Sequence, residues 1–222
     1  MIERGVPKMK QTTLIVPGYL GSEEAHWQSW LERQLPDAQR VRGIDWNVPN
    51  IGRWSTAVGD AIDRAVRPLW LVAHSFGCLA SVLAAATRPG RIAGALLVAP
   101  ADPDRFTAQG LRNSSNLESG IASLFENILI DYPALAVVST NDPWISVSTA
   151  THWAQRWGCR LASQGAAGHI NVSSGYGPWP ECLDFLRDMQ ASQGSCLLGE
   201  IDSPRSLIPA INIREEVSCP LS

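Results

Sequence analysis

The chain has 222 residues, of which 45% are hydrophobic and 18% charged, and its formal net charge is −3. This composition is typical of a globular protein and excludes a disordered or collagen-like chain. A net charge of −3 does not attract nucleic acid or an anionic membrane. No stretch approaches the ~20 consecutive apolar residues that span a bilayer. We therefore expect one globular domain with no nucleic-acid or membrane partner.

Cysteines and short motifs give no sign of a metal or a cofactor. The 5 cysteines are odd in number, widely spaced and without a CxxC pair, which argues against a disulfide framework or a zinc site. The chain has no HExxH motif, no GxGxxG after its first expected strand and no GxxxxGK[ST] loop. We predict neither metal nor cofactor. The apolar run at 14–16 is too short for a secretion signal, so we expect a cytoplasmic protein.

Short apolar runs alternate with helical periodicity along most of the chain. The run at 69–73 is apolar throughout, as in a parallel strand covered on both faces. Strands alternating with helices favour a doubly wound α/β fold with a mostly parallel, twisted sheet of about six strands and helices on both faces. We predict strands over 12–16, 39–44, 69–73, 92–99, 134–139 and 159–163, and helices over 23–34 (capped by Ser22), 55–66 (opened by Ser55), 76–87, 147–157 and 179–189.

Three segments fall outside this alternation. Residues 1–11 form a polar lead-in, in which Met9 is an alternative start to Met1. Residues 100–131 interrupt the alternation of strands and helices and are a candidate lid over the site. Their apolar residues at helical spacing are equally compatible with packing in the core. Residues 191–222 carry prolines and serines without a period, which favours a flexible tail, with 206–213 as an alternative extra strand. The domain itself is predicted over 12–190.

The segment Ala73-His-Ser75-Phe-Gly77 is the most informative of the chain. It joins an apolar strand to an alanine-rich helix, which is the context of a nucleophile elbow. A nucleophilic serine must project from a very tight turn, and the residues two before and two after it must be small. Ala73 and Gly77 meet that need, although Ala73 stands where the usual pattern has glycine. We predict Ser75 to be a catalytic nucleophile.

A serine nucleophile needs a base, normally a histidine. The chain has 4 histidines. His74 lies inside the elbow, where its side chain should point away from Ser75. His26 lies in the first turn of the helix predicted over 23–34, and His152 lies in the middle of another. His169 follows the last predicted strand in a glycine-rich loop, which is where this fold places its base, so we predict His169 in that role.

The carboxylate that orients the base should follow a late strand and precede the histidine. Asp142 follows the strand expected at 134–139 and precedes His169, which leaves room for one helix and one strand between them. Asp102, after the preceding strand, is the alternative. We prefer Asp142 as the third catalytic residue.

The oxyanion hole should combine two backbone N–H groups. One is that of Phe76, directly after the nucleophile. The other should come from the glycine-containing loop after the first strand, where the donor is Tyr19 or Leu20.

Tryptophan is unusually frequent, with 9 in the chain. Three of them lie near predicted site segments and are candidates to line an apolar or aromatic substrate pocket, with core packing as the alternative. These pocket candidates are Trp54, Trp144 and Trp179.

Several motifs in order resemble the small α/β-hydrolase family typified by retinoblastoma-binding protein nine. The resemblance covers about residues 12–190 and implies a compact α/β hydrolase whose serine–aspartate–histidine triad falls on Ser75, Asp142 and His169. It also implies hydrolysis of small esters or amides. The segments that carry it are Pro17-Gly-Tyr-Leu-Gly-Ser22, His26-Trp-Gln-Ser-Trp-Leu31, Val72-Ala-His-Ser-Phe-Gly-Cys78, Asn141-Asp-Pro143, Gly168-His-Ile-Asn171 and Ser174-Gly-Tyr-Gly-Pro-Trp179.

These observations predict a serine hydrolase that cleaves small carboxylic esters or amides through an acyl-enzyme. Two alternatives stay open. One is a catalytically silent binding protein on a hydrolase scaffold, because fold does not fix function. The other is an acyltransferase that uses the same triad. A protein partner is compatible with the resemblance, because partner binding is known for the family's namesake.

Overall fold

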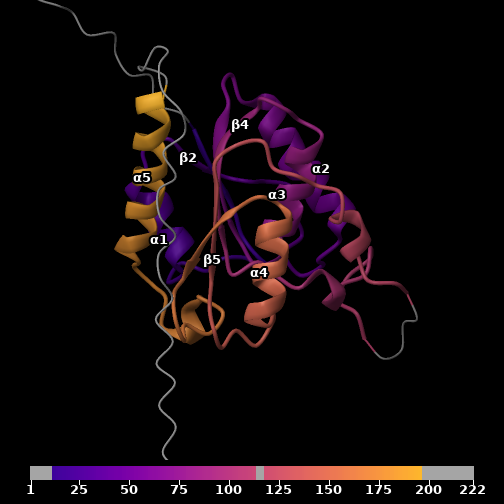
Figure 1. Ribbon diagram of the computed structural model, residues 1–222. Coiled ribbons are helices and arrows are strands. Elements are labelled where there is room, and N and C mark those ends of the chain that lie inside the picture. Colours follow the sequence, from indigo (N-terminus) through magenta and orange to yellow (C-terminus); the bar gives the residue numbers. More distant parts are fainter. Residues whose placement is uncertain (1–11, 114–117, 197–222) are drawn as a thin grey trace, which may run out of the picture.

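A six-stranded sheet, parallel throughout, forms the centre of the molecule in the computed structural model (Figure 1). The structure describes residues 12–113 and 118–196. The predicted lead-in at 1–11 and most of the predicted tail, from 197 onward, lie outside the described residues. The strand order β2-β1-β3-β4-β5-β6 reverses direction at β1, which confirms the predicted doubly wound α/β class.

Strands and helices alternate as predicted, with small shifts at their ends. The strands are β1 (Thr13–Val16), β2 (Ala38–Arg40), β3 (Leu69–His74), β4 (Ile92–Val98), β5 (Ala134–Val138) and β6 (Arg160–Ser163). The helices are α1 (Trp27–Gln34), α2 (Ile51–Arg64), α3 (Phe76–Ala86), α4 (Val147–Arg156) and α5 (Pro180–Cys196).

Side-chain alternation along the strands divides the core into two layers. In β3, Leu71 packs against the helices of one face, whereas Trp70 and Val72 pack against those of the other. Helices α2, α3 and α4 cover the first face, and α1 and α5 cover the second (Figure 1). Because both faces are covered, the central strands can be apolar throughout, as the pattern at 69–73 predicted.

Two helices begin elsewhere than predicted, because other residues cap them. Helix α1 begins at Trp27 rather than at residue 23, and its cap is His26 rather than Ser22. Helix α2 begins at Ile51 rather than near Ser55, because the side chain of Asn50 accepts a hydrogen bond from the N–H of Arg53. Asparagine is a favoured N-cap residue, whereas a ring nitrogen of histidine is a rarer substitute.

Helix α5 extends past its predicted end at 189 to Cys196, so the first residues of the predicted tail are helical. The side chain of Gln193 anchors this extension, because its Nε2 donates to the carbonyl of Ala93 in β4 at 2.8 Å. The boundary predicted at 190 is therefore too early for the helix.

The predicted insert contributes two short 3₁₀ helices, Pro103–Arg105 and Ala122–Leu124. Ile121 and Phe125 are buried in the same core layer as α2 and α3, so these two residues serve core packing, which was the alternative to a lid. Residues 114–117 of the insert lie outside the described part of the chain. The segment therefore covers one side of the sheet and is partly continuous with the core.

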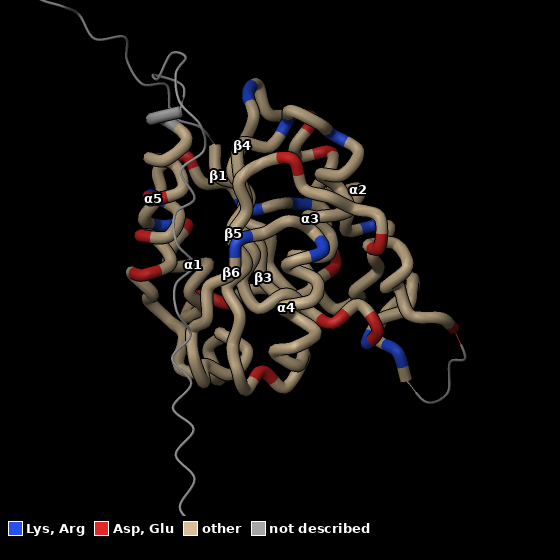
Figure 2. Tube along the Cα trace, viewed as in Figure 1, with Lys and Arg blue, Asp and Glu red and all other residues tan. Residues whose placement is uncertain are grey.

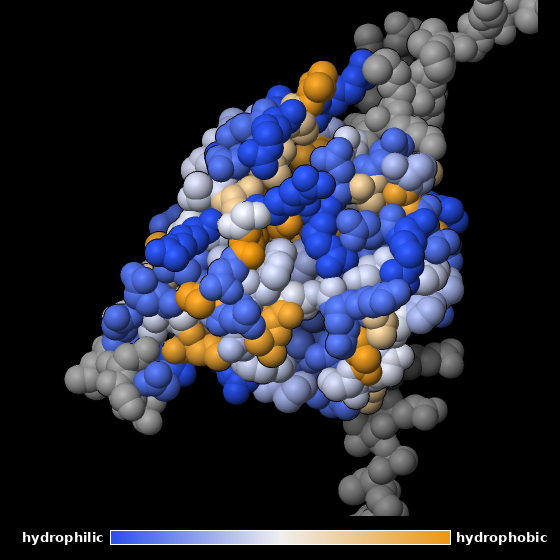
Figure 3. Space-filling model, turned by 180° about the vertical axis from the view of Figure 1, so that it is seen from behind, coloured by the Kyte–Doolittle hydropathy of each residue, from blue (hydrophilic) through white to orange (hydrophobic). Residues whose placement is uncertain are grey.

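Charged residues lie on helices, loops and outer strands, whereas β3, β4 and β5 carry none (Figure 2). The back of the molecule shows apolar side chains in small groups among hydrophilic ones rather than one broad apolar surface (Figure 3). Within the described residues, no helix has the length and apolar character needed to cross a bilayer.

Candidate active site

The first candidate site residue, Ser75, lies at the sharp turn from β3 into α3. Its backbone has φ 53° and ψ −126°, a region that non-glycine residues rarely adopt. Val16 of β1 stands opposite Ala73 of β3, so the loop after β1 passes directly beside the turn. The turn therefore lies where the strand order reverses, at the carboxyl ends of the strands, which is the usual ligand site of such sheets.

Close packing around the turn explains the small residues that the sequence places there. A Cβ on Gly77 would lie 2.3 Å from the carbonyl oxygen of Pro17, which is backbone and cannot swing aside. A Cβ on Gly18 would lie 2.7 Å from the Cβ of Ser75. The geometry is that of a nucleophile elbow, with glycine required on both sides of the contact.

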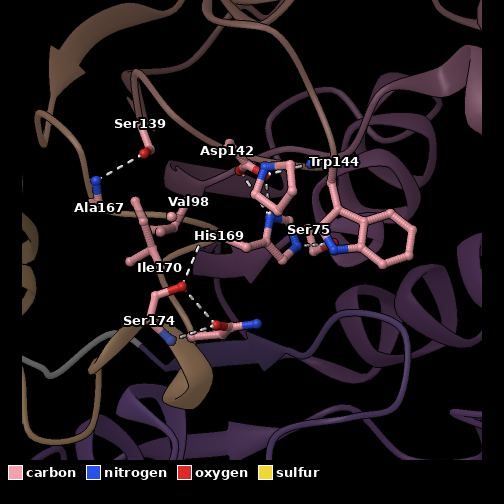
Figure 4. A network of polar contacts seen from close by, with 12 residues as sticks. Ser75, Val98, Ser139, Asp142, Trp144, Ala167, His169, Ile170 and Ser174 are labelled. Atoms are coloured by element: carbon pink, nitrogen blue, oxygen red, sulfur yellow. Dashed lines mark hydrogen bonds and ion pairs between the residues drawn. The ribbon is translucent and has the colours of Figure 1, made fainter.

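The structure brings the three predicted catalytic residues into hydrogen-bond contact (Figure 4). His169 Nε2 lies 2.8 Å from Ser75 Oγ, and His169 Nδ1 lies 2.8 Å and 3.0 Å from the two carboxylate oxygens of Asp142. A carboxylate can only accept, so Nδ1 carries the hydrogen and Nε2 is left to accept the serine hydroxyl. The Asp142 side chain is 1% exposed, which keeps its hydrogen bond to His169 away from solvent.

The alternative acid does not reach the base. Asp102 Oδ1 accepts the N–H of Asp104 at 3.0 Å and so caps the short helix that follows it. This local role is typical of an aspartate before a helical turn. Asp142 also accepts the N–H of Trp144 at 2.8 Å, which orients its carboxylate. Of the two aspartates considered, Asp142 is the one that contacts His169.

The other histidines lie apart from the hydrogen-bond chain, but two of them are close to it. His152 is exposed on α4. His74 is buried, and its Nε2 donates to the carbonyl of His169 at 2.9 Å, since a carbonyl can only accept. Burial holds the pKa of His74 well below its usual value of 6.5. The expectation that His74 simply points away is thus incomplete, because it supports the loop of His169.

Side chains that follow β5 hold the loop that carries His169. Ser139 Oγ accepts the N–H of Ala167 at 3.0 Å (Figure 4). Asn141 Oδ1 accepts the N–H of Gly168 at 2.7 Å. The N–H of Ala167 is buried, where lack of a partner would be costly, and the shorter bond to Asn141 fixes the next residue of the loop at its exposed side.

Three further contacts hold His169 and the residue after it from other sides. Ser174 Oγ accepts the N–H of His169 at 3.1 Å, and His74 supports its carbonyl. Trp27 Nε1 donates to the carbonyl of Ile170 at 2.8 Å. Ile170 has φ 48°, an unusual conformation for a β-branched residue. These contacts fix a strained loop and thereby the position of the imidazole ring.

Sequence reasoning did not identify the supports of this loop. Their roles depend on contacts across the fold, and only their neighbourhood in sequence offered a signal. Asn141 directly precedes Asp142, and Ser174 lies shortly after His169, so both fall inside or next to the motifs of the resemblance. The supporting residues are Trp27, His74, Ser139, Asn141 and Ser174.

The oxyanion-hole prediction requires one correction. The N–H of Leu20 donates to the carbonyl of Trp46 at 2.8 Å, so it is already engaged. Tyr19 is left as the candidate from this loop, and it lines the cavity beside Ser75. Phe76 is the first residue of α3, where an N–H has no acceptor within the helix. Tyr19 and Phe76 are therefore the two backbone donors available from the prediction.

A cavity of about 300 Å³ opens at Ser75 and His169. Trp144 is part of its wall, with its ring centre 5.9 Å from that of His169. Phe106, from the predicted insert, also lines it. Of the three tryptophans predicted as pocket residues, Trp144 is thus the one that the structure places on the cavity wall.

The other two tryptophans are core residues, which corrects their prediction as pocket residues. Trp54 is 1% exposed and packs edge-on against Phe76, beneath the elbow. Trp179 is 4% exposed and packs against Trp27 in the opposite core layer. Large amphipathic rings suit both a core and a pocket, so sequence position alone could not separate the two roles.

The chain matches the family model described as serine hydrolase over residues 13–188. A putative YdeN-like hydrolase from Pectobacterium atrosepticum is 35% identical, with 83% of this chain and 92% of that chain covered and a TM-score of 0.73. The ydeN gene product of Bacillus subtilis is 19% identical, with 82% and 100% covered and a TM-score of 0.65.

Est1E from Butyrivibrio proteoclasticus, solved with ferulic acid bound, is 15% identical, with 85% of this chain and 92% of that chain covered and a TM-score of 0.60. At that identity, the likeness shows a shared fold. A search of curated proteins gave no match. The family model covers most of the chain, and the YdeN-like structure is 35% identical over 83% of it, so this protein belongs to the serine hydrolase family.

Proposed function

We propose that the protein hydrolyses small carboxylic esters or amides through an acyl-enzyme, with Ser75 as nucleophile, His169 as base and Asp142 as the group that orients the base. The observation that carries this proposal is the unbroken chain of contacts from Ser75 Oγ through both ring nitrogens of His169 to the buried Asp142 carboxylate. This arrangement activates a serine hydroxyl on several unrelated folds.

In the first half of the reaction, Ser75 Oγ attacks the carbonyl carbon, and its proton passes to His169 Nε2. The carbonyl oxygen becomes an oxyanion that the N–H groups of Phe76 and Tyr19 stabilise. The tetrahedral intermediate then expels the alcohol or amine, which takes the proton from His169. The acyl group is left as an ester on Ser75.

In the second half, water attacks the ester carbonyl and gives a proton to His169 Nε2. Collapse of the second tetrahedral intermediate breaks the bond to Ser75 Oγ, which recovers that proton, and releases the carboxylic acid. Throughout, the Asp142 carboxylate stays ionised and stabilises the imidazolium. No other reactant is required besides the ester or amide and water.

The cavity supports a small substrate with an apolar part. Its volume of about 300 Å³ is at the lower end for ligand sites. Phe106 and Trp144 give it an aromatic wall, which suits an aromatic or branched acyl or alcohol group. The ferulic acid held by the fold neighbour Est1E is of that kind.

The proposal is tested by intact-mass labelling with a fluorophosphonate, which reacts with activated serines. We expect one adduct on the wild type, none on Ser75→Ala and none on His169→Ala. Turnover of p-nitrophenyl esters should fall roughly 10⁴-fold in both variants. Ser148→Ala, an exposed serine of α4, is the matched control and should label like the wild type. Absence of an adduct on the folded wild type would contradict the proposal.

A further inference from the structure

His26 caps the start of α1 and also lines the cavity. Its Nδ1 accepts the N–H of Gln28 at 3.1 Å and so caps the helix. The whole residue is only 4% exposed, and its ring packs edge-on against His74 at 5.0 Å between ring centres. The orientation of the ring is therefore fixed by the helix on one side and by His74 on the other.

The cap determines which ring nitrogen carries the hydrogen. An acceptor nitrogen has no hydrogen, so the single hydrogen of a neutral His26 is on Nε2. Burial, followed by the charges of Arg40 and His169, lowers the pKa of His26 from 6.5 to about 4. The ring is therefore neutral near pH 7, and Nε2 is a hydrogen-bond donor.

This donor has no acceptor on the protein within the described residues. It is also absent from the buried polar atoms of those residues that lack a partner, so it is reached from outside. His26 lines the cavity together with Ser75 and His169, and we take this cavity as the route by which Nε2 is reached. A fixed and almost buried donor is thus left for a molecule in the cavity.

We propose that His26 is a specificity-determining residue whose Nε2–H binds an oxygen acceptor of the substrate other than the scissile carbonyl. The inference rests on the function proposed above and names a substrate class: esters or amides that carry a further hydroxyl or carbonyl oxygen. Glu23, Asn171 and Ser173 extend the polar side of the cavity around His26. The apolar part of the substrate lies against Phe106 and Trp144.

Two substitutions of His26 separate its role as a hydrogen-bond donor from its role as the helix cap. His26→Asn keeps an oxygen in the place of Nδ1, because asparagine is a favoured N-cap, and it removes the donor at Nε2. His26→Gln places an amide N–H near the position of Nε2 and restores a donor. His152→Asn, on the exposed face of α4, is the matched control for loss of a histidine.

The kinetic test compares two matched substrate pairs, one on each side of the scissile bond. The pairs are p-nitrophenyl butanoate with p-nitrophenyl 3-hydroxybutanoate, and ethyl butanoate with 2-hydroxyethyl butanoate. We expect the wild type and His152→Asn to prefer the hydroxylated member of one pair by roughly 5- to 10-fold in kcat/KM. The ratio should fall to about one in His26→Asn and recover in part in His26→Gln. An equal ratio in wild type and His26→Asn would overturn the inference.

A second readout avoids turnover because it uses Ser75→Ala, which lacks the proposed nucleophile. Nitrogen-15 NMR of the imidazole rings should show His26 as the neutral form with its hydrogen on Nε2. Adding 3-hydroxybutanamide should shift this Nε2–H signal, whereas butanamide should not. A hydrogen on Nδ1, or equal shifts with both amides, would contradict the inference. Failure of the proposed function shows separately, as an absence of fluorophosphonate labelling on the wild type.

Discussion

The elbow at Ser75 and the loop at His169 both hold a side chain on strained backbone, but by different means. At the elbow, the bonds are between backbone groups: the N–H of Ser75 donates to the carbonyl of Val98 at 3.1 Å, and its carbonyl accepts the N–H of Cys78 at 2.9 Å. Strand β3 and helix α3 enclose the turn on both sides. The elbow is therefore held by backbone hydrogen bonds and by close packing of backbone against backbone.

The loop of His169 depends instead on side chains from several elements. Its N–H groups and carbonyls bond to Ser139, Asn141, Ser174, His74 and Trp27. Apart from Ser174, which is 5 residues from His169, these supports are at least 27 residues away in sequence from the loop residue that they bond. The comparison indicates that the turn at Ser75, the proposed nucleophile, is encoded locally, whereas His169, the proposed base, is positioned mostly by residues far away in sequence. Substitutions should therefore affect the two regions differently.

The largest effect is expected where backbone meets backbone in the elbow. Gly77→Ala would place a Cβ 2.3 Å from the Pro17 carbonyl oxygen and 2.6 Å from that of Val16. Because neither atom can move without shifting β1, we expect the free energy of unfolding to fall by about 3 kcal/mol or more. Urea denaturation measures this loss. The matched control is Gly52→Ala in α2, where the added Cβ meets nothing nearer than 3.6 Å, and a loss there as large as at Gly77 would contradict the argument.

Acid should lower the free energy of unfolding, because two buried histidines lie close to His169. Burial lowers the pKa of His26 from 6.5 to about 4 and that of His74 well below 6.5. Between pH 6.5 and 4 the unfolded chain therefore binds more protons than the folded one, so stability falls as pH falls through that window. His26 alone accounts for up to about 3 kcal/mol of stability, fully present above pH 6.5 and lost near pH 4.

Urea denaturation at pH 7, 5.5 and 4.5 measures that slope. The variant His26→Asn removes one of the two titrating rings and keeps an acceptor for the helix cap. Its stability should therefore vary less with pH over this range than that of the wild type. An unchanged slope would mean that His26 does not contribute to the acid sensitivity.

A smaller effect is expected in the loop of His169, where a substitution should lower the rate of hydrolysis without unfolding the protein. Asn141→Ala leaves the N–H of Gly168 without its acceptor and lets the loop relax, so the imidazole of His169 moves relative to Ser75. Small misplacements of catalytic groups cost roughly 10- to 100-fold in rate. We expect kcat on p-nitrophenyl esters to fall by that factor with little change in circular dichroism.

Asn141→Asp is the conservative variant for this test, because its carboxylate retains an acceptor for Gly168. It should recover most of the rate that Asn141→Ala loses. Equal loss in both variants would show that the acceptor oxygen is not what positions the loop.

The same contrast explains which parts of the molecule the sequence predicted. The elbow was predictable because its signal is local: an apolar strand, a serine between small residues and an alanine-rich helix. Asp142 and His169 were chosen by their order after strands, and the structure brings both to Ser75. The alternation of strands and helices gave the fold class for the same reason.

The parts that sequence did not predict depend on distant contacts. The N–H of Leu20 looked available, but it bonds to a carbonyl of Trp46 that belongs to another loop. Trp54 and Trp179 suit a pocket as well as a core, and only the packing of two layers decides between them. Helix α1 begins later than predicted because the ring of His26 caps it, whereas the prediction gave this role to Ser22.

The smallest effect is expected at the aromatic wall of the cavity. Trp144 is half-buried, and the guanidinium of Arg105 lies 5.1 Å from its ring centre. Trp144→Leu removes an aromatic surface next to His169, while the backbone N–H that bonds to Asp142 is retained. We expect KM for an aromatic ester to rise a few-fold, roughly 1 kcal/mol, with little change in kcat. A fall in kcat without a change in KM would instead assign Trp144 to the support of the base, and so to the same class as Asn141.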